Sequence, residues 1–206
     1  IAAIVASGKG DAAVRVLMAR RDGAWKAVRR MPEDEYLAPY MLDADGTHLI
    51  ALTNIGREQV DIVRLSLDTG QIGETVMSTP GVDAVAPILR RRDHAVLGAV
   101  VHRGGMPQMS YLTQSSGRAT DAILANFPDS QAMLWDESVD GRRAVVRVYS
   151  ETNPGTFYLY DATTRKLEKL LDARPALTVA KPAVSKAFTV KSRDGLSIEA
   201  FLTLPP

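Results

Sequence analysis

The sequence predicts an all-β protein, and three features of its pattern support this. Short apolar and β-branched runs alternate with turn dipeptides such as Asp140-Gly141, whose glycine accepts the positive φ of hairpin turns. The aspartate of this turn recurs, because Asp45, Asp93 and Asp140 lie 48 and 47 residues apart. A repeat of this length has room for about four strands, which is the content of one propeller blade. The pattern therefore predicts a partial β-propeller of about four blades, built from ~47-residue four-stranded repeats.

The clearest repeat follows the turn at Asp140-Gly141. Ala144 to Tyr149 reads as a strand, and Asn153-Pro154-Gly155 interrupts it because proline lacks an N–H donor. Phe157 to Tyr160 reads as the returning strand. Neither strand is long enough to be stable alone in water, so both must belong to a larger sheet.

The chain before this repeat shows the same pattern in two places, after an N-terminal stretch of two or three short strand-like segments in residues 1–31. The first strands are expected at Ala12–Ala19 and Ala24–Val28, with a turn at Arg21-Asp22-Gly23 between them. After the turn at Asp43–Gly46, the expected strands are His48–Thr53 and Val60–Leu67. A weaker third copy has the strand Ala95–His102, the loop Arg103–Pro107, the strand Met109–Thr113 and the turn Ser115-Ser116-Gly117.

Two segments could each form a turn or two of helix, Ala119–Asn126 and Leu167–Ala173, although blade strands fit them as well. A β-sandwich is the alternative fold, since it also has short strands at regular spacing. A sandwich does not require one aspartate turn to return every ~47 residues. The propeller is therefore the favoured prediction.

The C-terminal part departs from the repeat. Asp172 to Pro175 ends the last blade, and a linker follows. Phe188–Lys191, the turn Arg193-Asp194-Gly195 and the alternating run Leu196–Leu204 then predict a hairpin, whose next strand partner is expected outside this sequence. The predicted domains are 1–178, the propeller blades, and 179–206, a linker and hairpin.

Composition restricts the classes of partner. The 206 residues are 46% hydrophobic and 24% charged, which is typical of a folded protein with a core. A net charge of +1 gives no electrostatic footprint for nucleic acid or an anionic membrane, so neither partner is expected. Apolar runs of about five residues are far shorter than a membrane helix requires. The absence of cysteine excludes disulfides and thiolate metal sites, and the compartment stays open.

The last third of the sequence resembles a known family. The stretches that carry the resemblance are 153–161 (NPGTFYLYD), 173–175 (ARP) and 191–205 (KSRDGLSIEAFLTLP). They are similar to the prolyl oligopeptidase family of serine peptidases, especially its bacterial dipeptidyl aminopeptidase and acylaminoacyl-peptidase branch. The match is specific over about 140–206, and over 1–139 it rests on the blade pattern. In that family this passage joins the last propeller blade to the α/β-hydrolase domain.

The resemblance implies a function, but it assigns no catalytic role to any residue of this sequence. The family's catalytic Ser, Asp and His lie in the hydrolase domain, and this sequence contains no G-x-S-x-G nucleophile elbow. No catalytic, cofactor-binding or metal-binding residue is therefore assigned, and no cofactor is expected. The chain is expected to be the N-terminal propeller portion of a serine peptidase that cleaves short peptides. It would gate access of the peptide substrate and be inactive by itself.

Two further expectations concern partners. The alternative function is a stand-alone β-propeller that serves as a scaffold for protein interactions. Exposed blade edges also predict a homo-oligomer, with the 188–204 hairpin as an element that two chains could exchange.

The three histidines do not form a predicted site. His48 and His94 are expected to occupy equivalent turn positions in two repeats. His102 precedes Arg103-Gly104-Gly105, which resembles the HGGG oxyanion loop of esterases, but that loop requires a nucleophile elbow to act. A blade loop is the favoured interpretation, and the spacing of the histidines fits no metal-ligand motif.

Charged motifs also have simpler structural interpretations. Gly8-Lys9-Gly10-Asp11 lacks the spacing of a P-loop and is interpreted as a hairpin loop. Arg90-Arg91-Arg92, followed at once by Asp93, is interpreted as a solvated turn and not as a nucleic-acid contact. The acidic residues Glu33, Asp34 and Glu35 lie in an expected loop. The resembled dipeptidyl branch uses propeller acids to hold a substrate amino terminus, but no motif assigns that role to Glu33 or Glu35.

The large aromatic residues on strands are expected to fill the space between neighbouring blades. They are Trp25, Trp135, Tyr158 and Tyr160. A role in stacking against substrate is the alternative interpretation for these four rings.

Overall fold

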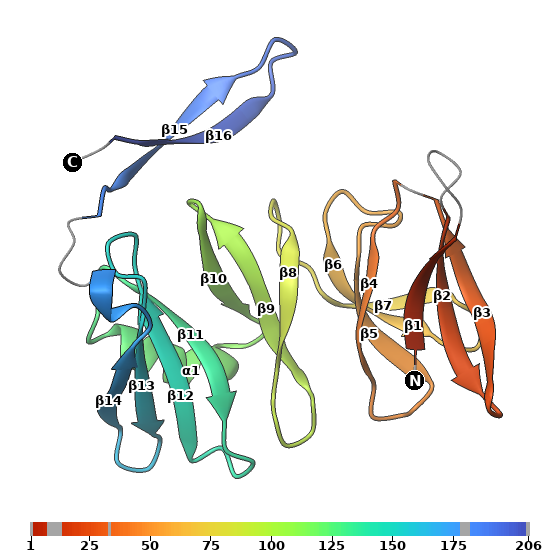
Figure 1. The fold of residues 1–206 in the computed structure, drawn as a ribbon, viewed down its shortest axis with the longest axis horizontal. Helices are drawn as coiled ribbons and strands as arrows, with labels where there is room; N and C mark the ends of the chain where they lie inside the picture. The colour runs from red at the N-terminus through yellow and green to blue at the C-terminus, as the bar shows by residue number, and fades with distance from the viewer. Residues whose placement is uncertain (1, 8–13, 33, 178–181, 205–206) are drawn as a thin grey trace. The chain divides into compact units, whose positions relative to one another are not determined.

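The computed structural model describes residues 2–7, 14–32, 34–177 and 182–204 (Figure 1). The chain forms two compact units. The first contains Ile1–His102 and Ser110–Thr113, and the second contains Arg103–Met109 and Gln114–Pro206. The described part is dominated by antiparallel strands, as the sequence predicts.

Two sheets form the beginning of the first unit. One has three strands in the order β1-β2-β3: β1 (Ala2–Ser7), β2 (Val14–Arg21) and β3 (Ala24–Met31). The next has four strands in the order β4-β5-β6-β7: β4 (Leu37–Leu42), β5 (His48–Thr53), β6 (Asp61–Ser66) and β7 (Ile72–Met77). Each strand pairs with its neighbour in sequence, which is the connectivity of a propeller blade.

The third sheet has three strands among the described residues, in the order β10-β9-β8: β8 (Ala84–Leu89), β9 (Val96–Arg103) and β10 (Met106–Tyr111). The strands β4, β8 and β11 begin at Leu37, Ala84 and Gln131, so the predicted period of 47 residues separates both pairs of starts. The strand expected at Met109–Thr113 begins earlier, because Gly104 and Gly105 both have positive φ and make a tight turn directly before Met106.

The turn expected at Ser115-Ser116-Gly117 is wrong, since these residues lie in α1 (Gln114–Leu124). This helix includes part of the Ala119–Asn126 segment for which a helix was one alternative. Its buried residues Gly117, Thr120 and Ile123 are three apart and therefore share one face. Because two of them are small or polar, the sequence gives only a weak apolar periodicity there.

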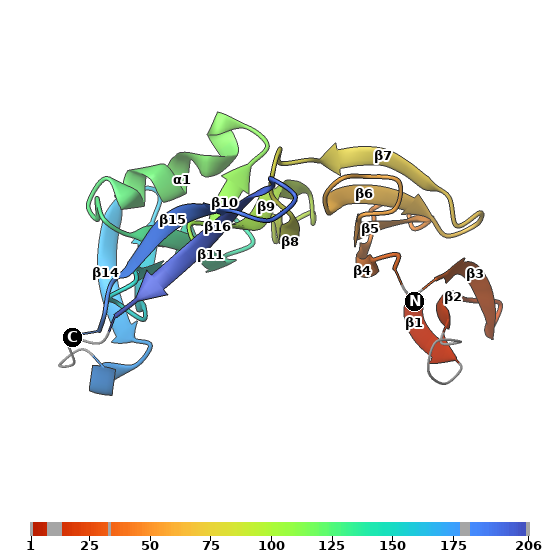
Figure 2. The same ribbon diagram turned by 90° about the horizontal axis from the view of Figure 1, so that it is seen from above.

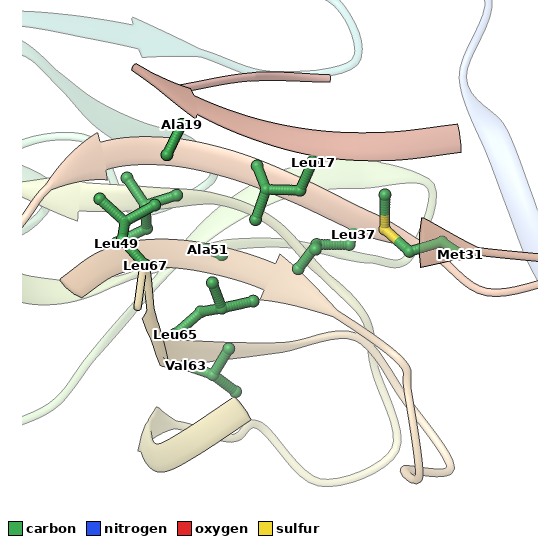
Figure 3. Packing of buried hydrophobic residues seen from close by; sticks show 9 residues of the cluster. All are labelled: Leu17, Ala19, Met31, Leu37, Leu49, Ala51, Val63, Leu65 and Leu67. Atoms are coloured by element: carbon green, nitrogen blue, oxygen red, sulfur yellow. The ribbon is translucent and has the colours of Figure 1, made fainter. Parts of the chain in front are cut away.

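Both faces of the β4–β7 sheet are buried within the first unit. Leu49 and Leu65 belong to one apolar cluster, which is completed by residues of β2, β3 and β4 (Figure 3). Ile50 of β5 and Ile62 of β6 belong to a second cluster, together with Ala84, Ala99 and Val101. Burial on both faces explains why His48–Thr53 is a continuous apolar run instead of an alternating one.

The second unit contains a four-stranded sheet and the helix. The strands follow the order β11-β12-β13-β14: β11 (Gln131–Glu137), β12 (Arg143–Tyr149), β13 (Thr156–Asp161) and β14 (Lys166–Asp172). Helix α1 lies against one face of this sheet (Figure 2). There, Ile123 packs with Ala132, Val146 and Val148. The segment Leu167–Ala173 is therefore mostly strand β14, the second of the two alternatives considered for it.

The C-terminal hairpin is confirmed as β15 (Ser185–Lys191) and β16 (Ser197–Thr203), after a short 3₁₀ turn at Pro175–Leu177. In its register Phe188 pairs with Ala200 and Val190 pairs with Ile198, so one face of the hairpin is apolar. The other face carries Phe201 beside polar residues. The predicted domain division at residue 178 stays a prediction.

Candidate functional site

The aspartate that recurs along the chain has a structural role in each turn. Its carboxylate accepts a hydrogen bond from the backbone N–H two residues ahead, which is the Asx-turn geometry. The donor–acceptor distances are 2.8 Å from Thr47 N to Asp45, 3.2 Å from Ala95 N to Asp93, 3.0 Å from Arg142 N to Asp140 and 3.3 Å from Leu196 N to Asp194. The repeated aspartates are therefore explained by turn formation.

The residue after each of these aspartates has a left-handed backbone. Its φ is 70° at Gly46, 68° at Gly141, 88° at Gly195 and 58° at His94. His94 thus takes the place of a glycine, whereas His48 lies three residues after its aspartate at the start of β5. The expectation that His48 and His94 are equivalent is wrong, because the two histidines share a residue type but lie at different positions relative to the turn aspartate.

We expect His94→Gly to raise the free energy of unfolding by about 0.5–1 kcal/mol, because glycine adopts the left-handed region without a Cβ clash. The reverse change at the matched turn, Gly46→His, should lower it by about 1 kcal/mol. Urea-induced unfolding of both variants measures the two effects. Shifts of the same sign in both variants, or a loss of stability in His94→Gly, would contradict the explanation.

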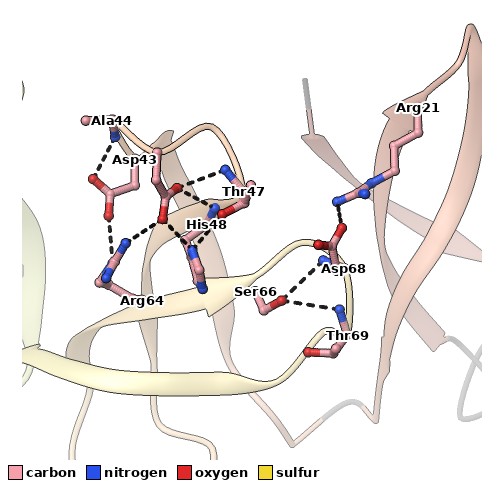
Figure 4. Close-up of polar contacts among 10 residues, drawn as sticks. Arg21, Asp43, Ala44, Thr47, His48, Arg64, Ser66, Asp68 and Thr69 are labelled. Carbon is pink, nitrogen blue, oxygen red and sulfur yellow. Dashed lines mark hydrogen bonds and ion pairs between the residues drawn. The ribbon is translucent and has the colours of Figure 1, made fainter.

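Arg64 joins the turn aspartates of the second repeat (Figure 4). Its Nε lies 2.6 Å from Oδ2 of Asp43, and its Nη2 donates to Oδ2 of Asp45 over 2.6 Å. The same Asp45 oxygen lies 2.6 Å from Nδ1 of His48. Arg64 comes from β6, so strand pairing and the turn together place the cluster. Arg21, the last residue of β2, forms an ion pair with Asp68, and Ser66 Oγ accepts from the N–H of Thr69 over 3.3 Å.

The hydrogen bond from the Thr47 backbone N–H holds the pKa of Asp45 well below its ordinary value of 3.8, and the hydrogen bond from His48 acts in the same direction. Because the pKa of Asp45 is lower in the folded state than in the unfolded chain, the folded state binds fewer protons than the unfolded chain once the pH falls toward 3.8 and below. The resulting contribution to stability is fully present above pH 3.8 and is lost as the pH falls below it.

We therefore expect the melting temperature to fall between about pH 5 and pH 2.5, and we expect Asp45→Asn to reduce that fall. Other turn carboxylates, including Asp93 and Asp140, also have lowered pKa values, so the fall should shrink without disappearing. Differential scanning fluorimetry across this range is the measurement. Asp22→Asn is the matched control for losing one exposed carboxylate, and an equal effect in that variant would contradict the assignment.

A surface hollow of about 530 Å³ lies beside this cluster, within the first unit. Polar side chains of Asp43, Arg64, Glu74, Asp93 and His94 line it, together with apolar side chains from the sheet cores. Two of its carboxylates already have cationic partners, since Asp43 pairs with Arg64 and Asp93 with Arg90 at 2.8 Å. The arrangement stabilises turns and offers a polar surface.

The cluster does not have the geometry of nucleophilic catalysis. A hydroxyl–imidazole–carboxylate relay uses opposite nitrogens of the imidazole ring. Here Thr47 Oγ1 at 3.0 Å and Asp45 Oδ2 at 2.6 Å both contact Nδ1 of His48. Among the described residues, no group of three or more histidine, aspartate or glutamate side chains could hold a metal ion. Within the residues that the structure describes, no helix is long and apolar enough to cross a membrane.

The other polar residues singled out by sequence lie in turns and strand ends. The Arg90–Arg92 segment follows β8, and Asp93 pairs with Arg90 and with Arg92, the latter at 3.6 Å, so the turn expected there is present. His102 is exposed near the end of β9. The carboxylate of Glu35 lies 3.7 Å from Arg29, and Asp34 is exposed. Gly8-Lys9-Gly10-Asp11 and Glu33 lie outside the described residues.

The aromatic residues divide into two groups. Tyr160 is buried and Tyr158 packs beside it in the core of the second unit, which agrees with a packing role. The same expectation is wrong for Trp25 and Trp135, which are 48% and 59% exposed. Trp135 lies at a β-bulge of the edge strand β11 and contacts Phe157 edge-to-face at 5.3 Å. Ala132 and Leu134 of β11 pack in the core, so the alternation of side chains along a strand places Trp135 on the opposite face.

Sequence reasoning did not identify Asp43 and Arg64 as partners. The available signal was a single arginine within the apolar run Val60–Leu67, opposite a turn that contains two aspartates. A charged residue in a strand with two buried faces requires a partner, and such a turn can supply one.

No model of a known protein family matches the sequence, and no curated protein is significantly similar to it. Solved structures do resemble it. A mutant of puromycin hydrolase complexed with PGG aligns with a TM-score of 0.54 and 21% identity over 91% of this chain. Oligopeptidase B from Leishmania major aligns over 96% of the chain with a TM-score of 0.51 and 11% identity. A prolyl endopeptidase aligns over 91% with a TM-score of 0.52 and 13% identity.

The fold is that of the prolyl oligopeptidase propeller. The predicted resemblance is thus confirmed at the level of the fold, and so is the prediction of a partial β-propeller built from blade-like antiparallel sheets. The chain spans 27–29% of the length of these three proteins, and this propeller fold is therefore one part of each of them.

Proposed function

We propose that this chain is the propeller region of a serine peptidase of the prolyl oligopeptidase family, in which it limits access to peptide substrates. The observation that carries the proposal is its fold, which matches part of an oligopeptidase and of a prolyl endopeptidase over more than nine-tenths of the chain. The hairpin β15–β16 adds support, because it follows the last four-stranded sheet where the family resemblance places the start of the hydrolase domain.

The finer proposal is that the whole protein removes dipeptides or acylated residues from the amino terminus of short peptides. The similarity of residues 153–161 and 191–205 to the dipeptidyl aminopeptidase and acylaminoacyl-peptidase branch supports it. A propeller that covers an active site would admit short, flexible chains and exclude folded proteins.

The test is to express the longest reading frame that contains this segment. We expect the product to react with a fluorophosphonate probe and to hydrolyse dipeptidyl or acylaminoacyl chromogenic substrates. The 206-residue chain alone is the matched control, and it should show neither property. Measurable turnover by that chain after removal of contaminating proteases would contradict the proposal, as would a reading frame without a nucleophile motif. The second result would favour the scaffold function.

The gating role has a separate readout. The full protein should cleave a short peptide much faster than the same sequence placed in a loop of a folded protein. Comparable values of kcat/KM for the two substrates would contradict a gating role and leave the peptidase assignment standing.

We also propose that the 206-residue chain self-associates through apolar strand surfaces. Support comes from the hairpin face that carries Phe188, Val190, Ile198 and Leu202, all of them exposed. The edge strand β14 is a further surface of this kind, since Leu170 and Leu171 on it are exposed.

Light scattering during size exclusion tests this proposal. The chain should be dimeric or larger at about 50 μM, and Phe188→Lys should shift it toward monomer. Thr189→Lys is the matched control, because it adds the same positive charge to an exposed residue on the opposite face of the hairpin. A monomeric wild-type chain at that concentration would refute self-association.

A further inference from the structure

The base of the β15–β16 hairpin is attached to the rest of the second unit by an aromatic contact. The ring of Phe201 lies against Gly105 in the turn between β9 and β10. The contact is so close that a Cβ added to Gly105 would lie 3.3 Å from Cε1 of the ring. Gly105 also has a φ of 74°, so glycine suits this position both for its backbone and for the ring above it.

A second attachment lies at the same end of the hairpin. The backbone N–H of Ser185, the first residue of β15, donates to Oε2 of Glu151 over 3.1 Å. Glu151 belongs to the loop between β12 and β13. Ser185 pairs with Thr203, two residues from Phe201, so both attachments are at the base of the hairpin.

The two attachment points are themselves joined through β12. Arg147 donates to the carbonyl oxygen of Pro154, in the loop that contains Glu151, and its guanidinium lies 5.1 Å from the ring centroid of Tyr149. The hydroxyl of Tyr149 donates to the carbonyl oxygen of Pro107, two residues from Gly105. The contacts therefore form a continuous network, called the circuit below. It runs from the hairpin to the Ser150–Gly155 loop, through Arg147 and Tyr149 of β12 to the β9–β10 turn, and from that turn to Phe201 of the hairpin.

We propose that the Phe201–Gly105 contact is a positioning contact that fixes the base of the hairpin to the β9–β10 turn. Tyr149 and Arg147 support it by holding that turn and the Ser150–Gly155 loop to one strand. The consequence for substrate access rests on the proposed function. If the hairpin begins a catalytic domain, this contact sets where that domain starts relative to the β11–β14 sheet.

Hydrogen exchange of the 206-residue chain, measured by mass spectrometry, tests the contact. Phe201→Ala should speed exchange of the Arg103–Met109 amides about fivefold, because losing a contact worth about 1 kcal/mol makes local opening that much more frequent. Phe188→Ala is the matched control. It removes an equal ring from the opposite face of the hairpin and should leave Arg103–Met109 unchanged. The conservative variant Phe201→Leu should restore most of the protection.

Equal exchange of Arg103–Met109 in Phe201→Ala and in Phe188→Ala would overturn the proposal. Tyr149→Phe gives a second test that leaves the hairpin sequence intact, and it should also speed exchange in Arg103–Met109. Unchanged exchange in that variant would remove Tyr149 from the circuit. These readouts require no enzymatic activity. A reading frame without a nucleophile would therefore refute the proposed function and leave the positioning contact as measured.

Discussion

Leu65→Ala is expected to lower the free energy of unfolding by about 2–5 kcal/mol. Leu65 is 0% exposed and lies in the cluster that joins the β1–β3 sheet to the β4–β7 sheet. The cluster also contains residues of four other strands, including Leu17, Leu37 and Leu49. Truncation would leave a cavity there, because strands held in two ladders cannot collapse into the space. Urea-induced unfolding followed by circular dichroism measures the loss.

Leu42→Ala is the matched control for this variant. Leu42 belongs to β4 of the same sheet but is 43% exposed. Its truncation should cost well under 1 kcal/mol. Similar losses for the two leucines would mean that the β4–β7 sheet is not packed between two apolar clusters.

The sequence predicted those parts of the fold that depend on local chemistry. The aspartate turns are set by a carboxylate that reaches the N–H two residues ahead, and residue type reports this directly. The strand His48–Thr53 and the hairpin of residues 185–203 followed from apolar runs between such turns. The spacing of the repeats then indicated blades, because a sheet of this size recurs at a fixed interval.

The sequence did not predict features that depend on contacts between distant residues. Helix α1 is stabilised by Ile123 packing on Ala132 and Val146, so its own polar first turn gave little sign of a helix. Trp135 is exposed because it lies on the face of β11 opposite Ala132 and Leu134, and residue type alone does not show which face of an edge strand is covered.

In the candidate site, too, the local features could be predicted from the sequence and the contacts between distant residues could not. His48 was noticed as a residue type, but its pairing with Asp45 depends on the turn geometry, and the role of Arg64 depends on the pairing of β5 with β6. The Phe201–Gly105 contact joins residues 96 positions apart in sequence. No spacing rule brings such a pair together. Absence of a nucleophile elbow, by contrast, could be read from the sequence, since that motif is local.

Gly98→Ala is expected to lower the free energy of unfolding by about 1–3 kcal/mol or more. Gly98 is buried in β9, and a Cβ at this position would lie 2.1 Å from the carbonyl oxygen of Ser110 and 2.9 Å from Cα of Tyr111. Both atoms are backbone, so relief requires β9 and β10 to separate locally. That movement would strain the hydrogen bond from Leu112 N to Leu97 O, now 2.9 Å, and disturb the adjacent Ala99 in the core. The approach of two backbones, and not a special φ, is therefore what requires glycine here.

Gly73→Ala separates this effect from the general consequence of adding a methyl group to a strand glycine. A Cβ on Gly73 of β7 would have a single close neighbour, the carbonyl oxygen of Arg64 at 3.3 Å. A shift of a few tenths of an ångström accommodates it, so the change in the free energy of unfolding should stay within about 1 kcal/mol. Urea-induced unfolding of both variants, with hydrogen exchange of Met106–Tyr111 as a local readout, tests the difference. If Gly98→Ala is as stable as Gly73→Ala and protects β10 equally well, the two backbones are not in contact at Gly98.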